Sequence, residues 1–190
     1  MTKRTMSAAA TLAAEPFASS KCRALFLRFI SHLKAACAAT AKQLGHRERE
    51  AVYQRAMAEE LGIRYTCELE YPVPVRFLTS DNRLVTLAHE RADIVVTPRP
   101  FLGEGGPVVV VEVKRGLPSS RSILPEALDQ ARRYATHIRR TLPVSGVCAV
   151  LFDKTGRMPP RVLSELWSPV APSKSSQHGQ ASNHHPPSSR

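Results

Sequence analysis

Apolar positions in the first part of the chain recur at helical spacing. From Cys22 to Gln43 an apolar residue falls at every third or fourth position, and Arg and Lys stand between them. This pattern predicts a basic amphipathic helix, which most often packs on its own domain but could also dock on a membrane or a partner helix. A second helix is predicted from Arg47 to Gly62, with Val52, Met57 and Leu61 on its inner face.

The following segment has the patterns of β-strands. Two strand-prone runs, Tyr65 to Phe77 and Leu84 to Val96, flank a polar turn from Ser80 to Arg83, and this arrangement predicts a hairpin. Pro72 and Pro74 interrupt the first run. Because proline cannot donate a hydrogen bond to a ladder, this strand is expected at the edge of a sheet or at a bulge.

The second half of the chain predicts a buried sheet. The run VVVVEVK at 108–114 is continuously apolar before its charges, so both faces of this strand should be covered and the strand should lie centrally. A helix is predicted from Pro125 to Arg140, a second buried strand from Gly146 to Phe152, and a short edge from Arg161 to Trp167. A strand, a helix and a strand in that order predict a right-handed parallel crossover. The predicted fold is therefore α/β, a mixed β-sheet flanked by helices.

The length and composition predict one folded domain between two polar ends. A chain of 190 residues fits a single domain, here predicted at 21–167. Residues 1–20 are basic and rich in Ala and Ser, which predicts a disordered or organelle-targeting segment, and 168–190 has the composition of a disordered tail. The apolar stretches are shorter than the roughly 20 residues of a membrane span. No integral membrane segment is therefore expected.

The charge and the cysteine content indicate which kind of partner and which cellular compartment to expect. With 27 Lys and Arg against 16 Asp and Glu, the formal charge of +11 favours a polyanion such as nucleic acid, although it could also serve solubility alone. The four cysteines show no CxxC spacing, which argues against a structural zinc site and a disulfide framework. An intracellular location is expected, in the cytoplasm or in the nucleus or nucleoid.

The candidate chemistry lies at the end of the valine run. Glu112 and Lys114 are two positions apart on one strand, so their side chains share a face while Val113 points the other way. Asp93 stands among apolar residues of the preceding strand, where an ionised carboxylate needs a cation nearby. These residues could form ordinary salt bridges at strand ends, or they could hold a metal ion.

The pattern of Asp93 followed by Glu112-Val113-Lys114 resembles the D…(D/E)xK core of the PD-(D/E)XK nuclease superfamily. Gln130-Ala-Arg-Arg-Tyr134 is similar to the QxxxY motif of its RecB-like branch. The stretch from Leu44 onward further resembles the small GxxExxY proteins, with Glu50 and Tyr53 at the ExxY positions. The resemblance implies a restriction-endonuclease-like architecture and a Mg²⁺-dependent nuclease that acts on DNA or RNA.

The resemblance also implies roles for individual residues. The implied catalytic residues are Glu50, Asp93, Glu112, Lys114 and Gln130. The implied ligands of Mg²⁺ or Mn²⁺ are the carboxylates of Asp93 and Glu112 and the carbonyl of Val113, which are the oxygen donors that hard cations prefer. The expected nucleic-acid contacts are Arg115, Arg132, Arg133 and Tyr134, and Tyr134 is equally explicable as core packing.

Two other functions fit the same sequence. A non-catalytic nucleic-acid-binding module on this fold would use the arginine-rich helix and show salt-sensitive binding. A scaffold or interaction protein would instead use the helix of residues 22–43 to dock on a membrane or a partner.

Overall fold

The computed structural model describes residues 20–99, 108–117 and 119–166. It has three helices and five strands within these ranges: α1 (Ser20–Leu44), α2 (Glu50–Gly62), β1 (Tyr65–Leu78), β2 (Leu84–Pro98), β3 (Val108–Gly116), α3 (Ile123–Ile138), β4 (Val144–Asp153) and β5 (Arg161–Leu166). The segments predicted as disordered, 1–20 and 168–190, lie outside the described residues apart from Ser20.

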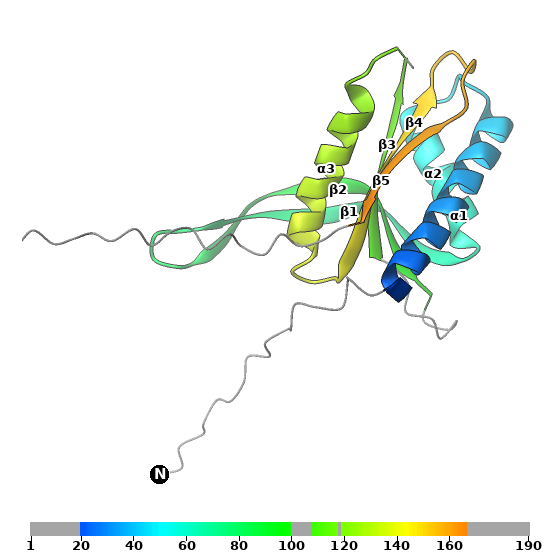
Figure 1. Ribbon diagram of the computed structural model, residues 1–190. Coiled ribbons are helices and arrows are strands. Elements are labelled where there is room, and N and C mark those ends of the chain that lie inside the picture. The colour runs from blue at the N-terminus through cyan, green and yellow to red at the C-terminus, as the bar shows by residue number, and fades with distance from the viewer. Residues whose placement is uncertain (1–19, 100–107, 118, 167–190) are drawn as a thin grey trace, which may run out of the picture.

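The five strands form one mixed sheet in the order β1-β2-β3-β4-β5 (Figure 1). β3 and β4 pair in parallel, and the other neighbours are antiparallel. The proline-containing β1 is an edge strand, and the valine-rich β3 is central, as the sequence predicts. The predicted class, an α/β fold with a mixed sheet flanked by helices, is confirmed.

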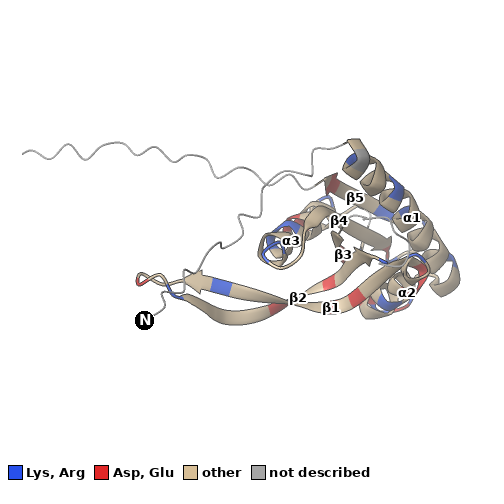
Figure 2. Cartoon of the chain, turned by 90° about the horizontal axis from the view of Figure 1, so that it is seen from below, with Lys and Arg blue, Asp and Glu red and all other residues tan. Residues whose placement is uncertain are grey.

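Helices cover both faces of the sheet. α1 and α2 lie on one face and α3 on the other (Figures 1 and 2). The side chains of β3 alternate between two cores: Val109, Val111 and Val113 pack with α1 and α2, whereas Val110 packs with α3. A continuous valine run is therefore what a strand buried on both faces requires.

The apolar stripe of α1 packs on its own domain. Phe26, Phe29 and Leu33 are buried in the core shared with α2 and the sheet. By length and composition the part of this helix from Cys22 to Leu44 could also span a membrane, a property that buried helices of other proteins share. Because α1 supplies core side chains, its removal would disrupt the domain rather than merely detach a docking element.

The buried face of α2 differs from the predicted one. Tyr53, Met57 and Leu61 are buried, whereas Val52 is exposed, so its assignment to the inner face was wrong. The three buried residues are spaced by four and form one stripe, and Val52 lies one position outside it. The Tyr53 ring packs on Phe152 with a centroid separation of 4.5 Å, and its hydroxyl donates to the Gly45 carbonyl at 2.8 Å.

The hairpin of β1 and β2 leaves the body of the sheet. β2 pairs with β3 only from Ile94 to Val96, yet it continues pairing with β1 as far as Leu84. Beyond Asp93, the hairpin therefore projects past α3 as a two-stranded ribbon (Figures 1 and 2). We call residues 70–91 the arm. The point at Asp93 and Glu112, where β2 separates from β3, is called the fork.

Gly146 of β4 marks a close approach between the sheet and α1. A Cβ added there would fall within the contact distance of the Phe26 ring. We expect Gly146→Ala to lower the free energy of unfolding by about 1–3 kcal/mol through overpacking. The matched control is Gly62→Ala, where a Cβ meets nothing and a helical position gains propensity. Urea denaturation of both variants checks this, and equal stabilities would contradict the packing described.

Candidate functional site

At the fork, hydrogen bonds from backbone to side chain connect β2 and β3 in place of the backbone hydrogen bonds of the sheet. The N–H of Asp93 donates to Oε1 of Glu112 at 3.2 Å, and the N–H of Val113 donates to Oδ2 of Asp93 at 2.7 Å. Each carboxylate thus accepts a hydrogen bond from the backbone of the other strand. This reciprocal arrangement fixes both carboxylates where β2 and β3 diverge.

The ammonium group of Lys114 lies among three carboxylates. Its Nζ is 3.3 Å from Oε2 of Glu112, 3.7 Å from Oδ2 of Asp93 and 3.9 Å from Oε1 of Glu50. Glu50 comes from the first turn of α2, and its other oxygen accepts from the N–H of Arg115 at 2.9 Å. Four of the five residues predicted as catalytic therefore meet at the fork.

The four side chains that meet at the fork differ in their exposure to solvent. Glu112 is fully buried, whereas the side chain of Glu50 is 38% exposed. Burial, and secondly the charge of Asp93, raise the pKa of Glu112 to about 8. Burial also raises the pKa of Glu50. Burial opposes a charged Lys114, but the charges of Asp93, Glu112 and Glu50 prevail and raise its pKa. The site therefore has more carboxylates than its single ammonium can neutralise.

The donor set at the fork fits a hard cation. Asp93 and Glu112 offer carboxylate oxygens, and Val113, whose side chain is buried in the α1–α2 core, could add only backbone oxygen. Mg²⁺ needs one or two carboxylates and completes its shell with water and substrate oxygens. In the described part of the chain, no three Asp, Glu, His or Cys side chains are arranged as a metal site. The fit thus rests on two carboxylates and a carbonyl.

Gln130 forms the α3 side of the site. With Lys114 and Arg133 it lines a cavity of about 420 Å³. Its amide nitrogen donates to the hydroxyl of Tyr134 at 2.8 Å. The Tyr134 ring is buried in the α3 core, and burial raises the pKa of its hydroxyl. The burial of the ring supports the core-packing alternative for Tyr134, and its contact with nucleic acid stays a prediction.

The three predicted arginine contacts have different surroundings. Arg133 is exposed beside the cavity. Arg132 forms ion pairs with Asp129 and Glu165, so its guanidinium is already neutralised. The guanidinium of Arg115 donates to the His46 carbonyl and ties the α1–α2 loop to β3. Arg132 and Arg115 thus have partners inside the fold, whereas Arg133 is exposed; the contact of each with nucleic acid stays a prediction.

Lys154 is a cation near the site that the sequence reasoning missed. It follows β4, its N–H donates to the Gly116 carbonyl at 2.9 Å, and its charge acts to lower the pKa of Glu50 against the larger effect of burial. The parallel pairing of β3 and β4 brings their carboxyl ends to one edge, where open α/β sheets bind ligands. The position of Lys154 directly after β4, the second buried strand, is therefore the feature of the sequence that indicates it.

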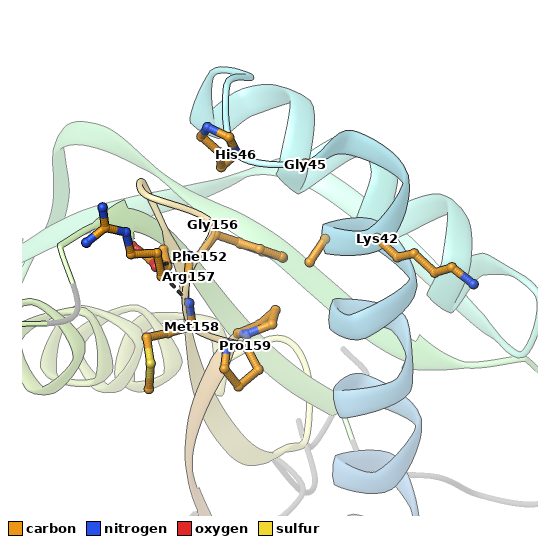
Figure 3. A pocket seen from close by; sticks show the side chains of 11 residues that line it. Lys42, Gly45, His46, Phe152, Gly156, Arg157, Met158 and Pro159 are labelled. Carbon is orange, nitrogen blue, oxygen red and sulfur yellow. Dashed lines mark hydrogen bonds between the residues drawn. The ribbon is translucent and has the colours of Figure 1, made fainter.

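A second cavity of about 270 Å³ lies between the end of α1 and the β4–β5 turn (Figure 3). The charged ends of Lys42 and Arg157 point away from it. Asp153 in its wall accepts hydrogen bonds from the N–H groups of Thr155, Arg157 and Met158. Although desolvation opposes the ionised form, hydrogen bonds to the carboxylate lower the pKa of Asp153 to about 2. Asp153 is thus a turn-stabilising residue.

No family model matches the chain, and no curated protein matches it. Among solved structures, the crystal structure of SSO0001 is similar with a TM-score of 0.43 and 13% identity, over 77% of this chain. The chain spans 64% of the length of that protein.

The raised pKa of Glu112 predicts a pH dependence of stability. Its ordinary value is 4.5 and its folded value about 8, so the folded state binds more protons and loses stability as pH rises between these values. Without divalent cations we expect a loss of at most about 5 kcal/mol across this window. Glu112→Gln should flatten the dependence, and Glu68→Gln, at an exposed carboxylate of β1, should not. Urea denaturation in the presence of chelator at several pH values measures the free energy of unfolding. If this free energy changes equally with pH in the parent and both variants, the raised pKa of Glu112 is contradicted.

Proposed function

We propose that this protein is a Mg²⁺- or Mn²⁺-dependent nuclease of the PD-(D/E)XK type that hydrolyses phosphodiester bonds in DNA or RNA. The observation that carries the proposal is the convergence of Asp93, Glu112 and Lys114 at the fork, with Lys114 within 4 Å of both carboxylates. Residues separated by about twenty positions in the chain meet in the order that the resemblance implies.

The carboxylates would hold the cation. Asp93 and Glu112, with the Val113 carbonyl, would bind Mg²⁺ or Mn²⁺. The bound ion supplies neutralisation of charge on the phosphoryl oxygens and activation of water. A cation at the fork would also compensate the buried Glu112 in its ionised form, which the metal-free fold disfavours. Metal binding and loss of the Glu112 proton are thus coupled.

Lys114 and Glu50 would divide the remaining tasks. The neighbouring carboxylates raise the pKa of Lys114 and keep it protonated, so it can stabilise negative charge on the phosphate but cannot accept a proton in that state. Glu50 is the most exposed carboxylate of the site and lies 3.9 Å from Lys114. It is placed to orient a water molecule or to accept its proton.

The surroundings of the site favour a phosphate backbone. Arg133 lines the cavity beside Lys114, and Lys154 is close enough to Glu50 for its charge to act on that carboxylate. The formal charge of +11 adds long-range attraction for a polyanion. Such a substrate places the protein in a nucleic-acid-containing compartment, the cytoplasm or the nucleus or nucleoid.

A cleavage assay tests the proposal. We expect Asp93→Ala and Lys114→Ala each to reduce metal-dependent cleavage by about 100-fold or more, because each removes a charge that acts on the reacting phosphate. The assay uses single-stranded, duplex and branched DNA and RNA, with Mg²⁺, Mn²⁺ or chelator. Glu68→Ala, an exposed carboxylate on β1, is the matched control and should cleave as the parent does. Cleavage that persists unchanged in both site variants would show that the assigned site is wrong.

One observation favours a second candidate, a non-catalytic nucleic-acid-binding module. Lys114 lies within 4 Å of the carboxylates of Glu50, Asp93 and Glu112, so the chain itself supplies a cation to this cluster. In that case the parent protein would bind nucleic acid in a salt-dependent manner but would cleave none of the substrates with any cation. The same assay, combined with a binding measurement at two salt concentrations, separates the two functions.

A further inference from the structure

The arm carries apolar side chains that nothing in the described chain covers. All residues from Ser80 to Arg91 are exposed. Phe77 pairs with Val85 and Leu78 with Leu84 across the ribbon, and all four are exposed. Successive pairs point to opposite faces of a ribbon, so both faces are apolar at this end. Leu87, which the bulge leaves without a partner on β1, is 65% exposed.

The two long edges of the arm differ in their protection. The outer edge of β1 contains Pro72 and Pro74, and Glu70 has a φ of 53°. Prolines and backbone irregularities are the usual means of blocking strand addition at an edge. The opposite edge, along β2 from Leu84 to Ala92, has neither Pro nor Gly. Within the described residues no strand pairs with that edge, because pairing with β3 stops at Ile94.

The charge of the arm indicates what kind of partner it accepts. Residues 70–91 contain three arginines and three carboxylates, so the arm is neutral in a chain of formal charge +11. A phosphate backbone gains nothing from a neutral apolar surface. Two copies of a basic protein, in contrast, can approach each other through their neutral parts without repulsion. An isolated two-stranded ribbon is also only marginally stable in water, and additional strands stabilise it.

We propose that the arm is a self-association element. The β2 edges of two copies pair antiparallel about a two-fold axis and turn two ribbons into one four-stranded sheet. This isologous contact brings Leu84, Val85 and Leu87 of one copy against the same residues of the other. Because the arm begins at the fork, the contact places the two candidate sites on one assembly. The association does not depend on nuclease activity.

Sedimentation of the full chain over a range of concentrations tests this. We expect the parent protein to form a reversible dimer. Leu87→Glu should raise the dimer dissociation constant about tenfold or more, since it buries two like charges near the axis. Ile63→Glu is the matched control: Ile63 is 66% exposed at the end of α2, outside the arm, and the dimer should be unaffected.

Leu87→Ser is a milder second variant that should weaken the dimer without adding charge, and circular dichroism establishes that each variant is folded. A parent protein that sediments as a monomer at all concentrations would overturn the proposal, including the case in which another segment of the same chain covers the arm. A dimer that survives both Leu87 variants would overturn it as well. Arm variants that weaken nucleic-acid binding while the association state stays unchanged would assign the arm to the substrate instead.

Discussion

The carboxylate of Glu112 is buried on the central strand of the sheet, and the candidate site depends on how the fold compensates it. A buried carboxylate is costly unless hydrogen bonds and opposite charge surround it. Here the Asp93 N–H and the Lys114 ammonium provide both. They do so only because β2 turns away from β3 at this position, which frees the Asp93 N–H from the ladder. These two groups do not fully offset the cost of burying the charged carboxylate, because the pKa of Glu112 is still raised.

The same departure of β2 produces the two features from which function is argued. On the β3 side it opens a fork in which Asp93, Glu112 and Lys114 converge and which Glu50 reaches from α2. On the β1 side it releases a ribbon whose apolar residues find no cover in the described chain. A sheet in which β2 and β3 paired along their full lengths would have neither the cluster nor the arm. Site and surface thus share one structural cause.

Much of this architecture is readable from the residues, and the limits have physical reasons. The valine run predicts a central strand because only a strand covered on both faces tolerates it, and Pro72 and Pro74 predict an edge. Alternation along the strand places Glu112 and Lys114 on one face. The separation of β2 from β3 depends on tertiary packing and has no local signal, so the sequence predicts only an ordinary hairpin at the arm. Helical periodicity likewise cannot tell which arginines are already paired, as Arg132 is with Glu165.

The central claim is that the fork is a divalent-cation site whose occupation requires ionised Glu112. Calorimetric titration of Mn²⁺ into the metal-free protein near neutral pH, repeated in buffers of different ionisation enthalpy, tests it directly. The account predicts binding of one or more ions with release of protons, and loss of both the binding and the proton release in Glu112→Gln. Absence of binding to the parent protein, or equal binding and proton release in the variant, would contradict it.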